Sequence, residues 1–146
     1  MKNTFRLKVV QDLAIKASDD AALALGQLNA EVTRQEQKLE MLVQYREDYR
    51  GRVRSTVNQD VHTAAWMNLQ QFLGKLDEAI EQQRSAVALA KAAVVRGQDD
   101  WQAKQVKVKA FDKLEQRHNA AADERMKKFE QRATDEFAAR GHNAKG

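Results

Sequence analysis

The fold is decided by residues 73–101, LGKLDEAIEQQRSAVALAKAAVVRGQDDW. Steps of seven residues that start at Leu73 reach an apolar side chain at eight of nine positions, and the exception is Glu115. The nine positions are Leu73, Ile80, Val87, Val94, Trp101, Val108, Glu115, Ala122 and Phe129. An apolar residue in every heptad is typical of a coiled-coil helix, because the repeat keeps one stripe turned toward a partner helix. We therefore expect one long helix here.

A second row of positions completes this seam, but it becomes polar after Ala90. The row contains Leu69, Leu76, Gln83, Ala90, Gly97, Lys104, Phe111, His118 and Arg125. A polar residue in a seam lowers stability, and it can either fix the register or mark a stretch whose partner is another protein. The seam is therefore expected to weaken toward its C-terminal end.

The first half of the chain repeats the pattern with less regular spacing. Its apolar stripe is made by Leu7, Val10, Ala14, Ala17, Ala21, Leu25, Leu28, Val32, Leu39 and Leu42, with Gln35 at a seam position. The pattern lapses only in residues 51–63, GRVRSTVNQDVHT, where short polar side chains cluster. Asp60 or Thr63 is a plausible N-cap for the helix that follows. We expect helices at about residues 3–54 and 64–139, a loop at about 55–63 and a disordered tail at 140–146.

These elements predict an all-α fold, an antiparallel two-helix coiled-coil hairpin within a single domain of residues 1–146. At ~1.5 Å per residue the helices are roughly 75 and 110 Å long, so the C-terminal helix overhangs the other. Folding about the centre of the loop places Leu42 near Leu76 and Leu7 near Phe111. Residues after about 115 then have no partner within the chain, and their apolar side chains are left for another molecule.

Composition excludes most other classes of protein. The 146 residues include no Pro, no Cys and 6 Gly, which disfavours β-sandwiches, disulfide-stapled modules and zinc ribbons. The three His are far apart and no Gly-rich phosphate loop is present, so we expect no enzyme activity, cofactor or metal site. No apolar run long enough to span a membrane and no secretory h-region occur, and we expect a cytoplasmic protein without membrane insertion.

The net charge of +4 is carried entirely by residues 102–146, which hold 11 basic and 7 acidic side chains. This end of the chain therefore suits an acidic surface. A nucleic-acid-binding helix is disfavoured, because the acidic residues interrupt the basic ones and no platform of aromatic side chains accompanies them.

Aromatic side chains gather near the predicted loop. Spacings of three, four and seven residues form one patch from Leu42, Tyr45, Tyr49, Phe72, Leu76 and Ala79. The simpler interpretation is that these residues seal the end of the coil. Tyr and Phe with a polar rim also suit a protein interface, and the rest of the chain is poor in aromatic residues.

Several strings resemble one known family. They are DLA at residues 12–14, DDAA at 19–22, MLVQYREDYR at 41–50, WMNLQQFLGKLDEAIEQQR at 66–84 and DEFAAR at 135–140, with Leu25, Gly26, Trp101 and Lys104 between them. Together they cover nearly the whole chain and resemble the FliJ family of the bacterial flagellar type III export apparatus.

The resemblance implies a cytoplasmic, non-enzymatic coiled-coil protein, peripheral at the inner-membrane export apparatus. Such a protein is similar to the central stalk of rotary ATPases: its terminal end enters the hexameric export ATPase and promotes assembly and hydrolysis. It also implies binding to the cytoplasmic domain of the export-gate membrane protein and escort of export chaperones.

The resemblance also assigns residues to the gate contact, namely Leu42, Tyr45, Tyr49, Phe72, Leu76 and Ala79. For the ATPase ring we expect, at the terminal end, Leu7, Lys8, Phe111, Lys113, Arg117, Arg125 and Phe129. Lys38 and Gln83 depart from the family pattern, where Gln and His are usual, and are not assigned. A generic coiled-coil scaffold and the equivalent stalk of a virulence injectisome are the alternatives.

Overall fold

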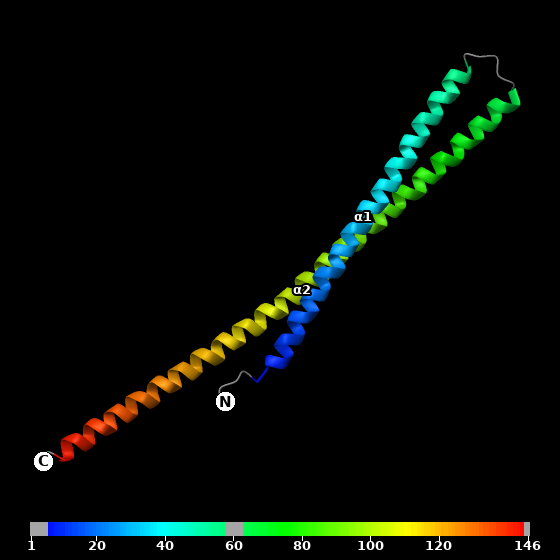
Figure 1. Cartoon of the computed structure of the whole chain (residues 1–146). Helices are drawn as coiled ribbons and strands as arrows, with labels where there is room; N and C mark the ends of the chain where they lie inside the picture. Colours follow the sequence, from blue (N-terminus) through cyan, green and yellow to red (C-terminus); the bar gives the residue numbers. More distant parts are fainter. Residues whose placement is uncertain (1–5, 58–62, 145–146) are drawn as a thin grey trace. The chain divides into compact units, whose positions relative to one another are not determined.

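The computed structural model describes residues 6–57 and 63–144, which form two helices, α1 (Lys8–Val57) and α2 (Thr63–Ala144) (Figure 1). The helices contain 50 and 82 residues. No strand occurs in the two described ranges. The expected all-α fold, two long helices packed against each other, is confirmed.

Both helices end later than their sequence patterns predicted, and α1 begins at Lys8, after a turn at residues 6–7, rather than near residue 3. α1 continues to Val57 rather than ending at residue 54, and α2 continues to Ala144 rather than ending at 139. Gly51 does not end α1, because no proline follows it and its backbone keeps a negative φ. Residues 140–144, expected to be disordered, belong to α2. The possible cap Asp60, with residues 1–5, 58–62 and 145–146, lies outside the described residues.

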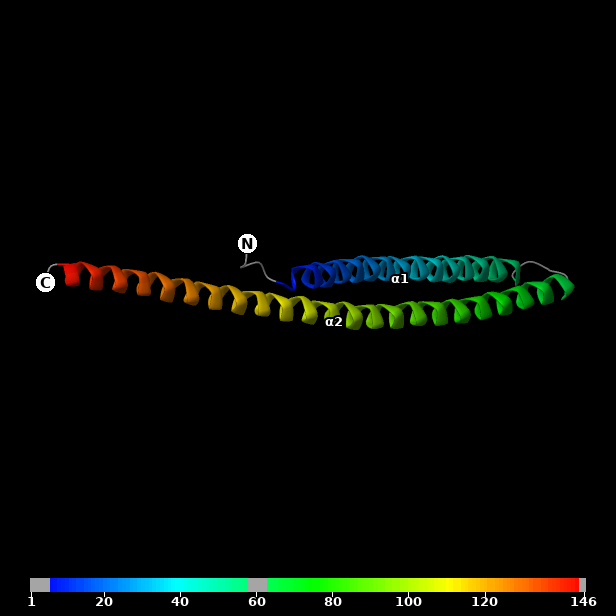
Figure 2. The same ribbon diagram turned by 90° about the horizontal axis from the view of Figure 1, so that it is seen from below.

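The chain divides into two compact units. The loop-side unit is Ala21–Trp101, and the terminal unit combines Met1–Asp20 with Gln102–Gly146. Within each unit, α1 and α2 lie side by side in both ribbon views (Figures 1 and 2). The expected single domain of residues 1–146 stays a prediction.

The helices of the loop-side unit are antiparallel. Glu36 lies 3.5 Å from Lys91, and Arg46 lies 3.4 Å from Asp77, so that residue numbers rise along α1 as they fall along α2. The core is a narrow seam, in which Ile80 is fully buried and Val53, Leu76 and Val87 nearly so. Burying a side chain such as that of Ile80 contributes about 1.5–3 kcal/mol.

The register of the loop-side unit agrees with the one expected by folding about the loop centre. That construction placed Leu42 near Leu76, and seven residues further on in both helices Gln83 Nε2 donates to Gln35 Oε1 at 2.7 Å. In the terminal unit, Gln11 Nε2 donates a hydrogen bond of 3.1 Å to Asp112 Oδ1. The expected pair Leu7 and Phe111 lies within about one helical turn of this contact.

The terminal unit has a polar seam. Gln11 and Ser18 are only 3% and 4% exposed, and the residues of α1 that are half-buried between them are Ala14 and Ala17. Gln105 Nε2 donates to Ser18 Oγ at 2.9 Å, as Gln11 does to Asp112. The predicted stripe missed Gln11 and Ser18, and it included Leu7 and Val10, which are 41% and 45% exposed.

The packed part of α2 ends at Ala122. Glu115, His118 and Ala122 are half-buried, so the packing reaches beyond the predicted limit near residue 115. Every described side chain from 123 to 142 is exposed, and Phe129 and Phe137 are 69% and 80% exposed. Phe129 continues the heptad pattern but has no partner within the chain, as expected for residues this far along α2. We call residues 123–142 the overhang.

Candidate partner-binding surfaces

Three aromatic rings form a cluster in the loop-side unit. The ring centroids of Tyr49 and Phe72 are 4.6 Å apart, those of Tyr45 and Phe72 are 6.3 Å apart with the rings edge-on, and those of the two tyrosines are 6.4 Å apart. Such pairs contribute about 0.5–1.5 kcal/mol beyond the area they bury. Tyr45 remains 48% exposed and Phe72 36% exposed. The aromatic cluster thus joins the helices and also presents ring surface to solvent.

The other three residues of the predicted patch differ in accessibility. Leu42 and Ala79 are half-buried, whereas Leu76 is 8% exposed and belongs to the core. A ligand that touches the patch therefore reaches mainly Tyr45 and Phe72, and Leu76 offers it almost no surface.

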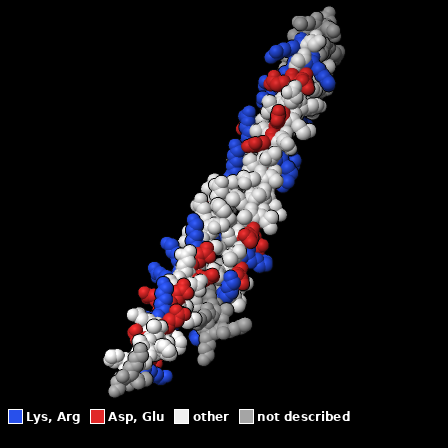
Figure 3. Space-filling model, turned by 60° about the vertical axis from the view of Figure 1, so that its left-hand side comes forward, with Lys and Arg blue, Asp and Glu red and all other residues white. Residues whose placement is uncertain are grey.

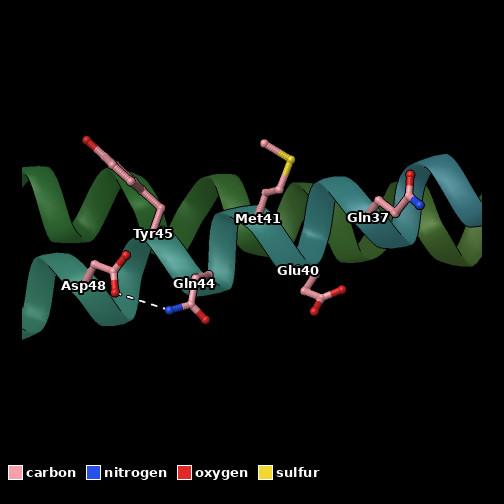
Figure 4. A pocket seen from close by; sticks show the side chains of 6 residues that line it. All are labelled: Gln37, Glu40, Met41, Gln44, Tyr45 and Asp48. Atoms are coloured by element: carbon pink, nitrogen blue, oxygen red, sulfur yellow. Dashed lines mark hydrogen bonds between the residues drawn. The ribbon is translucent and has the colours of Figure 1, made fainter.

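Two hollows adjoin the aromatic cluster. The seam hollow, of about 460 Å³, is lined by Lys38, Met41, Leu42, Tyr45 and Gln83. The outer hollow, of about 550 Å³, lies on the surface of α1 and is lined by Gln37, Glu40, Met41, Gln44, Tyr45 and Asp48 (Figure 4). Both hollows share Met41 and Tyr45. Lys38 and Gln83, the positions that depart from the family pattern, line the seam hollow.

Sequence reasoning missed Met41, whose side chain is 72% exposed. A signal was present, because Met41 and Tyr45 are four residues apart and four-residue neighbours share one face of a helix. The predicted patch contained Leu42 instead, because Leu42 lies in the apolar stripe of the seam and Met41 does not.

Charged and amide side chains tie the helices together beside the aromatic cluster. Arg46, whose side chain is 18% exposed, lies 3.4 Å from Asp77 on α2 and 3.6 Å from Glu47 on its own helix. Further along, the amide of Gln83 donates to Gln35, and Gln35 donates to Glu31 at 2.6 Å. The bond from Gln35, followed by that from Arg34, lowers the pKa of the Glu31 carboxyl. This arrangement holds the helices in register but contains no catalytic pair.

The residues expected to contact the ATPase ring occupy the terminal unit in two groups. Leu7, Lys8 and Phe111 lie where α1 begins, and Lys8 pairs with Asp12 at 3.5 Å. Phe111 lines an apolar hollow of about 470 Å³ with Val10, Leu13, Ala14, Ala17, Lys104, Lys107, Ala110 and Leu114. Lys113 and Arg117 are exposed nearby, whereas Arg125 and Phe129 belong to the overhang. Sequence reasoning missed Leu13, which is 60% exposed.

Charge on the surface is mixed. On the face shown in Figure 3, Lys and Arg side chains alternate with Asp and Glu and form no unbroken basic patch. Among the described residues, no group of three or more His, Asp or Glu is arranged to hold a metal ion. No helix in the described ranges is both long and apolar enough to cross a bilayer.

The sequence is similar to known proteins along its whole length. The family model described as FliJ, flagellar FliJ protein, matches residues 1–146. The flagellar FliJ protein of Salmonella typhi is 33% identical over 134 residues, which cover 92% of this chain and 91% of that protein. The flagellar FliJ protein of Escherichia coli (strain K12) is 31% identical over the same length and the same shares. The helices, the aromatic cluster and these matches lead to one conclusion: the chain belongs to the FliJ family of flagellar export components.

Proposed function

We propose that this protein acts as a non-enzymatic, central-stalk-like component of flagellar protein export, with different partners at its two units. The loop-side unit binds the cytoplasmic domain of the export-gate membrane protein through the aromatic cluster. The terminal unit engages the hexameric export ATPase and promotes its assembly and activity. In this role the protein lies at the cytoplasmic side of the inner membrane and escorts export chaperones.

The observation that carries the gate assignment is the exposure of Tyr45 and Phe72 in an otherwise narrow seam. If the aromatic cluster served only to close the end of the coiled coil, its rings would be expected to be buried, because buried apolar surface is what stabilises a coiled coil. The exposed half of Tyr45 adds nothing to that stability. Tyr and Phe side chains at a surface suit the centre of a protein interface. The amides and charges around them form the polar rim that such interfaces usually have.

The overhang supports the ATPase assignment. Its apolar side chains Met126, Phe129 and Phe137 are exposed and can be buried by another protein. Its Lys, Arg, Asp and Glu side chains permit many exposed ion pairs, each worth about 0–1 kcal/mol. Contacts of this strength exchange readily as a ring changes state.

The experiment measures both partners with the full-length chain. Tyr45→Ala with Phe72→Ala is expected to weaken binding to the gate domain at least tenfold and to leave stimulation of the ATPase unchanged. A chain that ends at Ala122 is expected to show the reverse. Leu23→Ala, an exposed apolar change elsewhere on α1, is the matched control. Unchanged gate binding by the double variant, with helicity lost, supports the simpler sealing role.

The generic scaffold is separated from this proposal by oligomeric state. Sedimentation over a range of concentrations gives a stable oligomer for a scaffold and a monomer for a stalk. Membership of the FliJ family favours the flagellar stalk over that of an injectisome.

A further inference from the structure

Met41 forms an exposed apolar ridge between the seam hollow and the outer hollow. Met41 is 72% exposed and lines the outer hollow with Tyr45 (Figure 4). The same two residues also line the seam hollow. A thioether side chain is flexible and polarisable, so it adapts to the surface of a ligand at low cost. Met41 and Tyr45 therefore offer apolar surface that continues from the aromatic cluster along the edge of the seam and onto the surface of α1.

Two carboxylates border the outer hollow without a cation of their own. Asp48 accepts a hydrogen bond of 3.2 Å from Gln44, and neither Glu40 nor Asp48 forms an ion pair within the described ranges. Eight residues separate them along α1, a distance of ~12 Å.

Neighbouring acidic residues on α1 are neutralised within the chain. Glu36 pairs with Lys91, and Glu47 pairs with Arg50 at 3.2 Å. The outer hollow is therefore distinguished by an apolar ridge beside two uncompensated negative charges.

The apolar surface of Met41 and the charges of Glu40 and Asp48 favour a ligand that is both apolar and cationic. An apolar side chain fits against Met41, and a Lys or Arg beside it approaches Glu40 or Asp48, where it gains charge-assisted hydrogen bonds. An anionic lipid surface is disfavoured, because the carboxylates repel it.

We infer that the gate-binding surface continues from the aromatic cluster across Met41 into the outer hollow, where the gate domain inserts an apolar side chain flanked by a Lys or Arg. This inference rests on the proposed function, since it assigns further contacts to the same partner. In it, Met41 supplies packing, and Glu40 and Asp48 supply orientation and the rate of encounter. The interface thereby uses two faces of α1.

The test is calorimetric titration of the full-length protein with the cytoplasmic domain of the export-gate protein. Met41→Ser is expected to weaken binding roughly tenfold, as loss of an interface anchor does. Leu23→Ser, a change at a side chain that is 69% exposed on the same helix, is the matched control and is expected to leave the affinity unchanged. Circular dichroism checks that every variant keeps its helices, which is expected because both side chains are exposed.

The contribution of the two carboxylates to gate binding is tested with separate variants. Glu40→Gln with Asp48→Asn is expected to weaken binding and to flatten the dependence of affinity on salt concentration, because the screened attraction has been removed. Glu78→Gln, an exposed carboxylate on α2, is the control. An unchanged salt dependence in the double variant overturns the cationic chemistry assigned to the occupant.

The outcomes distinguish this inference from the function on which it rests. If Tyr45→Ala with Phe72→Ala abolishes binding while Met41→Ser binds normally, the extension is wrong and the gate contact stands. If neither variant has an effect, the gate contact itself fails. If the protein alone self-associates and Met41→Ser abolishes this, the occupant is a second copy of the chain, which also overturns the inference.

Discussion

The side-chain amide of Gln83 reaches across the helices and donates to both oxygens of Gln35, at 2.9 Å to the backbone carbonyl and at 2.7 Å to the side chain. Gln83 occupies a half-buried seam position between Leu76 and Ala90. A polar pair at such a position is satisfied only in one alignment of the two helices, so it specifies the register at some cost in stability.

Gln83→Ala is expected to lower the free energy of unfolding by about 1–2 kcal/mol, because it removes the bond and leaves Gln35 without its partner. Gln35→Leu combined with Gln83→Leu is expected to be neutral or stabilising. Urea denaturation measures both. A double variant that is less stable than Gln83→Ala contradicts this account.

Two glycines within α2 are expected to respond differently to alanine. A Cβ at Gly74 meets no atom within 4 Å, so Gly74→Ala raises the free energy of unfolding by about 0.5–1 kcal/mol through helix propensity. A Cβ at Gly97 falls 2.7 Å from Leu28 Cδ1, and the leucine has to move. Gly97→Ala is therefore expected to raise the free energy of unfolding by less than Gly74→Ala does, or to lower it. Thermal or urea unfolding measures both variants, and an equal increase in the two contradicts the close approach of Leu28 to Gly97.

The α1 segment of the terminal unit is expected to open more readily than that of the loop-side unit. Its seam contains Gln11 and Ser18 among alanines, and an apolar hollow of about 470 Å³ adjoins it. Fewer buried apolar contacts lower the free energy of local opening. Amide hydrogen exchange followed by mass spectrometry is expected to be faster in residues 8–20 than in residues 25–50. Equal protection of the two segments excludes this difference.

Acid is expected to weaken the network around Glu31. Because its pKa is lowered in the folded protein from the usual 4.5, the ionised carboxylate stabilises the fold above that pH, and the contribution is lost as pH falls through the folded value. Glu31→Gln should therefore melt below the wild type at neutral pH, and the difference in Tm should shrink in acid. A difference that is constant with pH shows that the charge has no role.

Heptad spacing predicted the helices and most of the seam, because the positions of apolar residues determine which face of a helix is buried. Ile80 and Val87 lie where the pattern placed them. Gln11 and Ser18 were missed because polarity alone does not reveal that a side chain finds a hydrogen-bond partner on the other helix. The alignment of the helices depends on such pairs, and Gln35 with Gln83 lies in the register that folding about the loop centre predicted.

The candidate surface was predicted in part. Tyr45, Tyr49 and Phe72 do meet, since residues near a hairpin loop are brought together by topology. The core position of Leu76 agrees with its place in the second row of the seam. The exposure of Met41 depends on the rotation of α1 about its own axis. Sequence periodicity defines that rotation only to within a neighbouring residue, so the roles of Met41 and Leu42 could not be told apart in advance.

The overhang inherits its helical form from the packed part of α2. Starting a helix is the unfavourable step, whereas each added residue extends it at little cost, so residues 123–142 propagate from a turn that packing has already formed. A partner that binds the overhang meets a preformed helix, so binding costs less conformational entropy than binding to a disordered segment that must fold first. Proline introduced near Ala120 interrupts the helix between the packed part of α2 and the overhang. It is expected to weaken binding without altering a contacting side chain.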